Sequence, residues 1–195
     1  MSLLLALLIQ AAAAPSPVKP VPAKAPPAAA KPAAAPAAPR APALRPIDSA
    51  TALDAFTGGC WTYLDDPDGL RAALAGGTLP LVQQPRPEGN PSELWRSNQA
   101  ILTYTASDSL PAGVPTRQCV LTVRLSGAVD QLALAARIAG ALQLAGGRTR
   151  TSGGLSQTVW DAPRGPRIQR LIAATRAAPG GQSDLRLTAL LLAPK

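Results

Sequence analysis

Histidine is absent from the 195 residues of this chain. Its absence excludes Ser-His-Asp and Cys-His catalytic arrangements and every metal site that needs an imidazole ligand. The sequence after residue 46 also lacks the Gly-x-Ser-x-Gly and Ser-x-x-Lys nucleophile motifs. We therefore predict no catalytic residue, no metal site and no cofactor, and we interpret the protein as non-enzymatic. A carboxylate-based enzyme is the third-ranked alternative, and it would need two facing acids with raised pKa values in a cleft.

Aromatic residues are also scarce, with three Trp, two Tyr and one Phe. Proteins that bind nucleic acids combine a basic stripe with interleaved aromatic side chains. The net charge of +8 does not supply this pattern, because five of the 19 basic residues lie in the segment 15–46, which contains no acid. The remaining 14 basic and 11 acidic residues leave residues 47–195 with a net charge of only +3. We predict no nucleic-acid partner.

The chain begins with an apolar run from Leu3 to Ile9, followed by Ala11 to Ala14. A short apolar core followed by small residues is typical of a signal peptide, although a basic stretch before it is missing. The 12 residues from Leu3 to Ala14 fall short of the ~20 that span a bilayer. We predict a signal peptide over residues 1–14, cleaved near its end, no stable membrane span, and a periplasmic or secreted protein. An uncleaved membrane anchor is the alternative.

Residues 15–46 are dominated by 11 Pro and 12 Ala. Proline removes amide donors, and the segment offers little large apolar surface, so we predict a disordered, extended linker. Its positive charges could bind an unknown envelope protein or a polyanionic surface, or the segment could be a plain solvated tether. The basic residues in question are Lys19, Lys24, Lys31, Arg40 and Arg45.

Residues 47–195 are long enough for one domain with its own core. Asp48 and Ser49 can cap a helix that presents Leu53, Phe56 and Cys60 on one face and runs to Leu64, with a break at Gly58–Gly59 as the alternative. Asp66–Pro67 can open a second helix that runs through Leu74 to Gly76–Gly77, which completes a helical hairpin.

After Pro80 the apolar spacing changes from helical to alternating. We predict an α+β fold in the order ααβββαβββ, in which an antiparallel sheet of five to six strands has helices on one face. The predicted strands are 93–97, 100–107, 117–125, 155–161, 167–175 and 184–192, and the predicted third helix is 128–145.

Two polar clusters could suggest ion binding. Asp65, Asp66 and Asp68 do not complete a calcium-loop pattern, and helix capping explains the last two. The segment 146–154 contains glycines, hydroxyls, Arg148 and Arg150, but it follows a helix instead of opening one. We therefore interpret it as a mobile connection and not as an anion cradle.

The two cysteines lie far apart in the sequence, each at an apolar position of its predicted element. In an exported protein this placement predicts a disulfide between Cys60 and Cys119, with two buried free thiols as the alternative. A zinc site is disfavoured because there is no histidine to complete it.

Phe56, Cys60, Asp66–Pro67, Leu70–Arg71 and Cys119 form a pattern that resembles small exported proteins of uncharacterised function in high-GC Gram-negative bacteria. The resemblance covers residues 47–195 and implies an exported, disulfide-bonded α+β domain without a known activity. The Pro-rich tract is also similar to that of TonB-type envelope energy transducers, but this chain lacks their anchor His and C-terminal Tyr-Pro signature. We predict a binding or scaffolding protein, with a TonB-like transducer as the alternative. Neither the ligand nor the oligomeric state follows from the sequence.

Overall fold

The computed structural model describes residues 43–107 and 114–193, and the predicted signal peptide and nearly all of the predicted linker lie outside these ranges. The described residues form a mixed α+β fold. Its helical elements are α1 (Ser49–Phe56), the π-helical turn η1 (Thr57–Trp61), α2 (Pro67–Ala75), α3 (Gln131–Leu142) and the short 3₁₀ turn η2 (Pro179–Gly181). Its strands are β1 (Val82–Gln83), β2 (Ser92–Arg96), β3 (Ala100–Ala106), β4 (Pro115–Leu125), β5 (Arg148–Ser152), β6 (Leu155–Arg164), β7 (Arg167–Ala178) and β8 (Gln182–Leu192).

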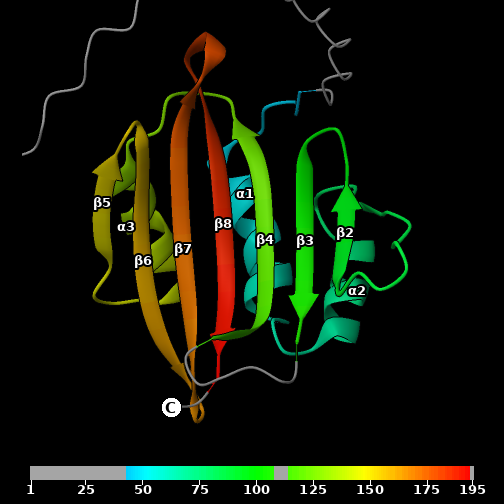
Figure 1. Cartoon of the computed structure of the whole chain (residues 1–195). Helices are drawn as coiled ribbons and strands as arrows, with labels where there is room; N and C mark the ends of the chain where they lie inside the picture. The colour runs from blue at the N-terminus through cyan, green and yellow to red at the C-terminus, as the bar shows by residue number, and fades with distance from the viewer. Residues whose placement is uncertain (1–42, 108–113, 194–195) are drawn as a thin grey trace, which may run out of the picture. The chain divides into compact units, whose positions relative to one another are not determined.

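All eight strands belong to one antiparallel sheet in the order β1-β2-β3-β4-β8-β7-β6-β5 (Figure 1). Each half of the sheet is a four-stranded meander, and the halves join where β4 pairs with β8. The connection from β4 to β5 contains α3, which carries the chain from the middle of the sheet to its far edge. Residues 60 and more apart in sequence therefore become neighbours at the sheet centre, for example Thr122 and Arg186.

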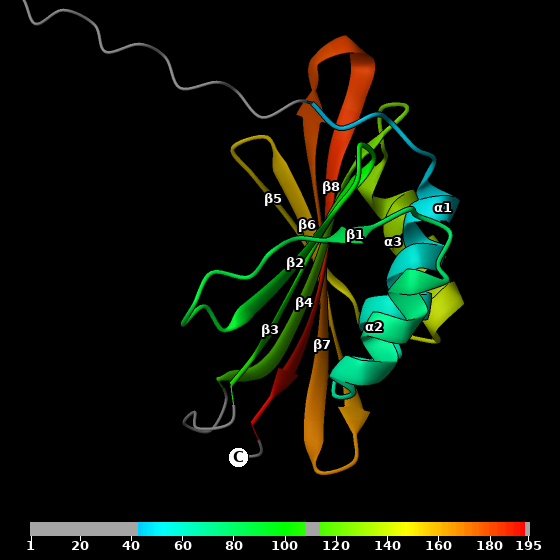
Figure 2. The same ribbon diagram turned by 90° about the vertical axis from the view of Figure 1, so that its right-hand side faces the viewer.

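The helices α1, α2 and α3 lie on the same face of the sheet (Figure 2). The largest fully buried side chains come from both layers and include Phe56 and Leu70 from the helices and Leu121 and Leu187 from the sheet. This arrangement confirms the prediction of an antiparallel sheet with helices on one face. None of the described helices is long and apolar enough to cross a membrane.

Local sequence explains where the first helices begin. The Asp48 carboxylate accepts a hydrogen bond from the Thr51 amide at 2.8 Å, and the Asp66 carboxylate accepts one from the Gly69 amide at 2.9 Å. Pro67 occupies the first turn of α2, where its missing amide proton costs nothing. Both predicted N-caps are confirmed.

The helix that starts at α1 neither stays regular to Leu64 nor breaks at Gly58–Gly59. It widens into η1, in which the Thr62 amide donates to the Thr57 carbonyl five residues earlier, at 3.2 Å. Glycine weakens the α-helical preference here, and a π-turn keeps the backbone hydrogen-bonded while it changes the direction of the chain.

Two strands and one helix end were not predicted. β1 has only two residues, between Pro80 and Pro85, so it carries no periodicity. β5 falls in the segment predicted as a mobile connection; all five of its residues are exposed, and it is a strand because it pairs with β6. The third helix ends at Leu142 and not near Ala145, because Gln143 adopts a left-handed conformation with φ of 52°. The order is therefore ααββββαββββ, in place of ααβββαβββ.

Candidate binding surface on the uncovered sheet face

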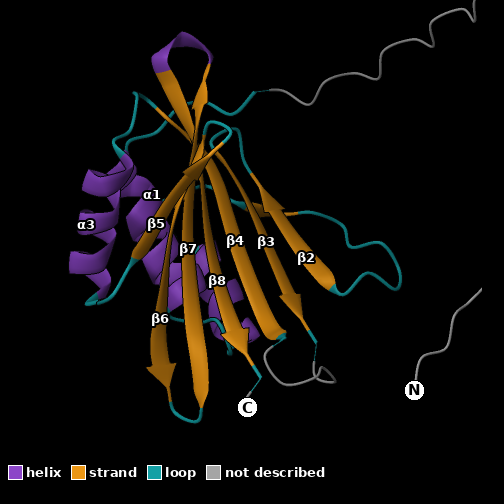
Figure 3. Ribbon diagram, turned by 60° about the vertical axis from the view of Figure 1, so that its left-hand side comes forward, coloured by secondary structure: helices purple, strands orange, loops and turns teal. Residues whose placement is uncertain are grey.

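The face of the sheet opposite the helices is not covered by any element of the described chain (Figure 3). Successive side chains of a strand point to opposite faces, and the printed register assigns each one to a side. We call this side the open face. In β3, β4, β8, β7 and β6, its residues include Ile101, Thr103, Thr105, Gln118, Val120, Thr122, Arg124, Asp184, Arg186, Thr188, Leu190, Ile168, Arg170, Ile172, Ala174, Arg176, Leu155, Gln157, Val159 and Asp161. The strands β2 and β5 add Ser92, Leu94, Arg96, Arg148, Arg150 and Ser152.

Three adjoining hollows cross the open face. The largest, about 560 Å³, lies over the central strands, and hollows of about 300 Å³ and 320 Å³ flank it toward β3 and β5. The central hollow shares Gln118, Thr122 and Arg186 with the first neighbour and Gln157 with the second. The three hollows thus form one trough that runs across the strands, and we call it the trough.

The floor of the trough is apolar and hydroxylic. Ile172 and Leu190 lie beside the nearly buried Thr188, and Val120, on the neighbouring strand, is only 7% exposed. Thr103, Thr105 and Gln118 add hydroxyl and amide groups on the β3 side. An ordinary solvated sheet face is mostly polar, so the apolar floor favours a surface that another molecule covers.

No aromatic side chain of the described residues belongs to the open face. Trp95, Trp160, Tyr104 and Phe56 are buried in the core between sheet and helices. Trp61 and Tyr63 are partly buried and pack against the same core from the helical side. The open face therefore offers no stacking platform for bases.

Positive charge is concentrated on the open face. Seven arginines and two aspartates lie there, for a net charge of +5, whereas the remaining seven basic and nine acidic residues of 47–195 sum to −2. Asp184 pairs with Arg124 at 2.9 Å, and Asp161 pairs with Arg170 at 2.6 Å and with Arg148 at 3.8 Å. The other four arginines form no ion pair with a described residue: Arg96, Arg150, Arg176 and Arg186.

The carboxylates with resolved shifts are all held ionised. A hydrogen bond from Arg71 lowers the pKa of Glu93, and one from Arg170 lowers the pKa of Asp161. Hydrogen bonds from Thr51 lower the pKa of the helix cap Asp48. A general acid at neutral pH needs the opposite shift.

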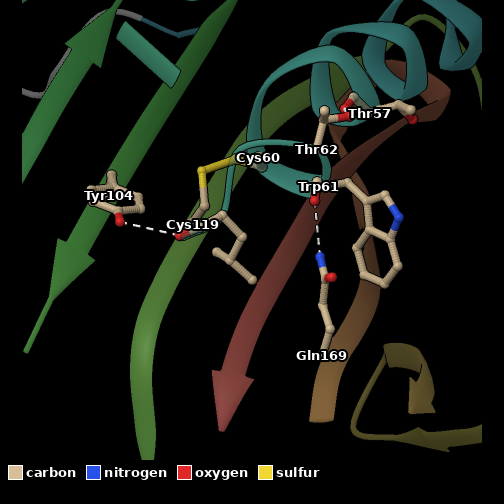
Figure 4. Close-up of a disulfide and its surroundings, with 8 residues drawn as sticks. Thr57, Cys60, Trp61, Thr62, Tyr104, Cys119 and Gln169 are labelled. Carbon is tan, nitrogen blue, oxygen red and sulfur yellow. Dashed lines mark hydrogen bonds between the residues drawn. A yellow bond between two sulfur atoms is a disulfide. The ribbon is translucent and has the colours of Figure 1, made fainter. Parts of the chain in front are cut away.

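The disulfide lies on the other side of the sheet. Cys60 of η1 is bonded to Cys119 of β4, with 5.3 Å between their Cα atoms (Figure 4). The prediction of this bridge is confirmed. Nearby, the Tyr104 hydroxyl donates to the Leu64 carbonyl at 3.1 Å, and the Gln169 amide donates to the Trp61 carbonyl at 2.9 Å. These contacts fasten the helical hairpin to the sheet.

Asp65, Asp66 and Asp68 each have a separate structural role. Asp65 accepts hydrogen bonds from Arg164 at 2.8 Å and from Arg167 at 2.9 Å, which ties the helices to the β6–β7 hairpin. Asp66 caps α2, and Asp68 pairs with Arg71. Within the described residues there is no group of three or more His, Cys, Asp or Glu side chains that could hold a metal ion.

One smaller hollow of about 170 Å³ lies on the helical side, next to Gly58, Gly59, Gly76 and Gly77. Asp54 is its only ionisable lining residue. This hollow is smaller than each of the three hollows of the trough, and no arginine lines it.

Sequence reasoning did not identify the open face. The segment that contains Arg148 and Arg150 is the strand β5 and not the predicted mobile connection, and no sequence pattern distinguishes Arg186. The strand pairing brings Arg148 and Arg150 to one end of the trough and Arg186 to its centre. The alternation of apolar and polar residues along β4 was the one sequence signal for the open face. It predicts that the sheet has a second face, but it does not predict which residues of other strands lie on that face. Of the linker's basic residues, only Arg45 lies in the described range, and its amide donates to the Asn98 carbonyl at 2.6 Å.

A scan of the chain against protein-family models gave no match, and searches of the curated proteins and of the solved structures gave no significant match. The similarity to small exported proteins therefore stays a prediction.

Proposed function

We propose that this chain is an exported, non-catalytic protein that acts in the periplasm or after secretion, and that it binds or scaffolds a partner through the open face. The observation that carries the proposal is the trough, a continuous hollow across the strands with an apolar floor. Its central hollow falls in the size range of binding pockets, roughly 300–1,000 Å³.

The charge distribution supports a binding role. Arginines that form no ion pair with a described residue keep their hydrogen-bond donors available, and a guanidinium presents several of them in a fixed plane. The ion-paired carboxylates support a non-catalytic role, since the pKa shifts of Glu93 and Asp161 keep both groups ionised and unsuited to donate protons.

The disulfide supports export, because such bonds persist in oxidising compartments and are rare in the reducing cytosol. The mature N-terminus tests the leader. The full chain is expressed in a Gram-negative host, and the intact mass and compartment of the product are measured. A periplasmic or secreted product that begins near Ala14 supports the proposal. A membrane-bound product that retains Met1 contradicts it and favours the TonB-like alternative.

Photo-crosslinking tests the surface. A crosslinking residue is placed at Thr103 or Gln157 in the trough, and at the exposed α3 positions Leu132 or Ala136 as matched controls. The chains are irradiated in intact cells of the source organism. The proposal predicts the same discrete adduct from both trough positions and none from α3. Adducts from α3 alone, or none from any position, would contradict it.

A further inference from the structure

Three of the four unpaired arginines of the open face, Arg96, Arg186 and Arg150, fall on one row across the sheet. The fourth, Arg176, lies in the next row, opposite Asp184. Following the register from β2 to β5, the row reads Arg96, Ile101, Thr122, Arg186, Ala174, Gln157 and Arg150. Three strand steps separate Arg96 from Arg186, and three more separate Arg186 from Arg150. At ~4.8 Å per step, each interval is about 14 Å. No acid stands anywhere in this row.

A second row beside it is apolar or hydroxylic. It reads Leu94, Thr103, Val120, Thr188, Ile172 and Val159 before it reaches Arg148. The two rows are two residues apart along every strand, which is about 7 Å. A row with three arginines and a row of apolar and hydroxylic side chains therefore run side by side across the open face. The stretch of both rows from β4 to β5 lies in the trough.

We propose that the trough binds an acidic segment of a partner polypeptide that carries apolar side chains between its acids. This inference rests on the proposed function and names the chemistry of the partner. An extended segment rises ~3.3 Å per residue and directs side chains i, i+2 and i+4 to the same side. Carboxylates at i and i+4 are then about 13 Å apart, close to the interval between Arg186 and Arg150.

The groups between these two arginines fit the rest of the pattern. Ala174 is small and leaves room in the row, and Ile172 in the neighbouring row offers an apolar contact for the side chain at i+2. Gln157 presents an amide group that can bond the peptide backbone, and Thr122, on the other side of Arg186, adds a hydroxyl group. The expected recognition pattern is acid, any residue, apolar residue, any residue, acid.

Other occupants match the open face less well. Two copies of this chain face to face would oppose +5 with +5, and the tract 15–46 carries basic residues and no acid. Single-stranded nucleic acids are bound in part by stacking on aromatic side chains, which the open face does not offer. Anionic glycans and nucleic acids could pair with the arginines, but they would leave the apolar row in contact with water.

The test is a binding titration of the full mature chain against synthetic nonapeptides. The first has the sequence Glu-Ser-Leu-Ser-Glu-Ser-Leu-Ser-Glu, and the second has the same composition with its three acids adjacent. Fluorescence anisotropy at low salt gives the dissociation constants. We expect the spaced peptide to bind at least about fivefold more tightly than the shuffled one, because only the spaced acids reach two arginines.

Matched variants locate the site. R186Q and R150Q should each weaken binding of the spaced peptide about fivefold, and the double variant about 25-fold. R137Q removes an exposed arginine of α3 on the other side of the sheet and should change binding less than twofold. Substitution of all five basic residues of the tract 15–46 by Gln should leave the preference for the spaced peptide intact.

Several outcomes would overturn the inference. Equal losses in R186Q and R137Q, or loss of the preference when the tract is neutralised, would show non-specific attraction. The chain could instead bind vesicles with anionic phospholipid, or heparin, and not the peptides. If R150Q/R186Q then weakens that binding, the trough is assigned to a membrane or a glycan. If crosslinks form at Thr103 and Gln157 but neither peptide binds, the partner chemistry is wrong and the binding surface stands.

Discussion

Cys60 in η1 is covalently joined to Cys119 in β4, so the disulfide links the helical hairpin directly to the centre of the sheet. The two residues are 59 positions apart, and both are completely buried. The bond therefore fixes the helical layer to the face of the sheet opposite the trough.

Loss of this bond should strongly destabilise the fold. A crosslink that closes a loop of this length restricts the unfolded chain and is worth about 4 kcal/mol in the chain-entropy description. The C60A/C119A variant should therefore lose about that much free energy of unfolding, measured by urea denaturation. The same loss should follow reduction of the native chain with dithiothreitol. A loss below about 1 kcal/mol in both experiments would show that the bridge does not restrain the unfolded state.

The Glu93–Arg71 pair predicts a pH-dependent stability. Glu93 is only 8% exposed, and the Arg71 Nε–H donates to its carboxylate at 3.0 Å. This bond holds the pKa of Glu93 below its ordinary value of 4.5. The stabilisation is therefore fully present above pH 4.5 and is lost as the pH falls through the folded-state pKa.

E93Q tests this linkage. It should lower the free energy of unfolding by about 2 kcal/mol at pH 7, and the difference from the native chain should narrow as the pH falls below 4.5. E88Q, at an exposed residue without a described ion pair, should change stability by less than about 0.5 kcal/mol. An E93Q effect that is the same at pH 7 and at about pH 3 would assign it to packing and not to charge.

Gly147 is confined by the core. A Cβ placed there would meet Nε1, Cε2 and Cδ1 of Trp160 within 3.0 Å, and the indole is 3% exposed and cannot move aside. G147A should destabilise the protein by about 2 kcal/mol. At Gly140, inside α3, a Cβ meets nothing within 4 Å, so G140A should stabilise it by about 0.5–1 kcal/mol. Thermal denaturation gives the melting temperature of each variant relative to the native chain. Equal shifts in melting temperature for G147A and G140A would refute this packing constraint.

The sequence predicted those features that rest on local patterns. Asp48 and Asp66 were identified as caps because side-chain oxygens before a helix satisfy its free amides. The disulfide was predicted because both cysteines stood at apolar positions of their elements. The predicted inward face of β4 is confirmed by the burial of Cys119, Leu121 and Val123.

Features that arise from pairing between distant segments could not be predicted in this way. β5 contains no apolar residue, so nothing in its own sequence distinguishes it from a loop. The arginine row joins residues of β2, β8 and β5, and it exists only because β4 pairs with β8 and the two meanders lie edge to edge. Single-strand alternation assigns each residue a side, but only the register across strands shows which side chains meet.

Isoleucine methyl NMR is the most direct test of the claim that the open face binds an acidic partner. Ile101, Ile168 and Ile172 lie on the open face, whereas Ile47 and Ile138 are buried in the core between sheet and helices. The chain is labelled at its isoleucine δ1 methyl groups and titrated with the spaced nonapeptide. We expect a saturable shift of the Ile172 signal, with the Ile47 and Ile138 signals unchanged. Shifts confined to Ile47 and Ile138, or no shift at peptide concentrations that saturate the anisotropy signal, would contradict it.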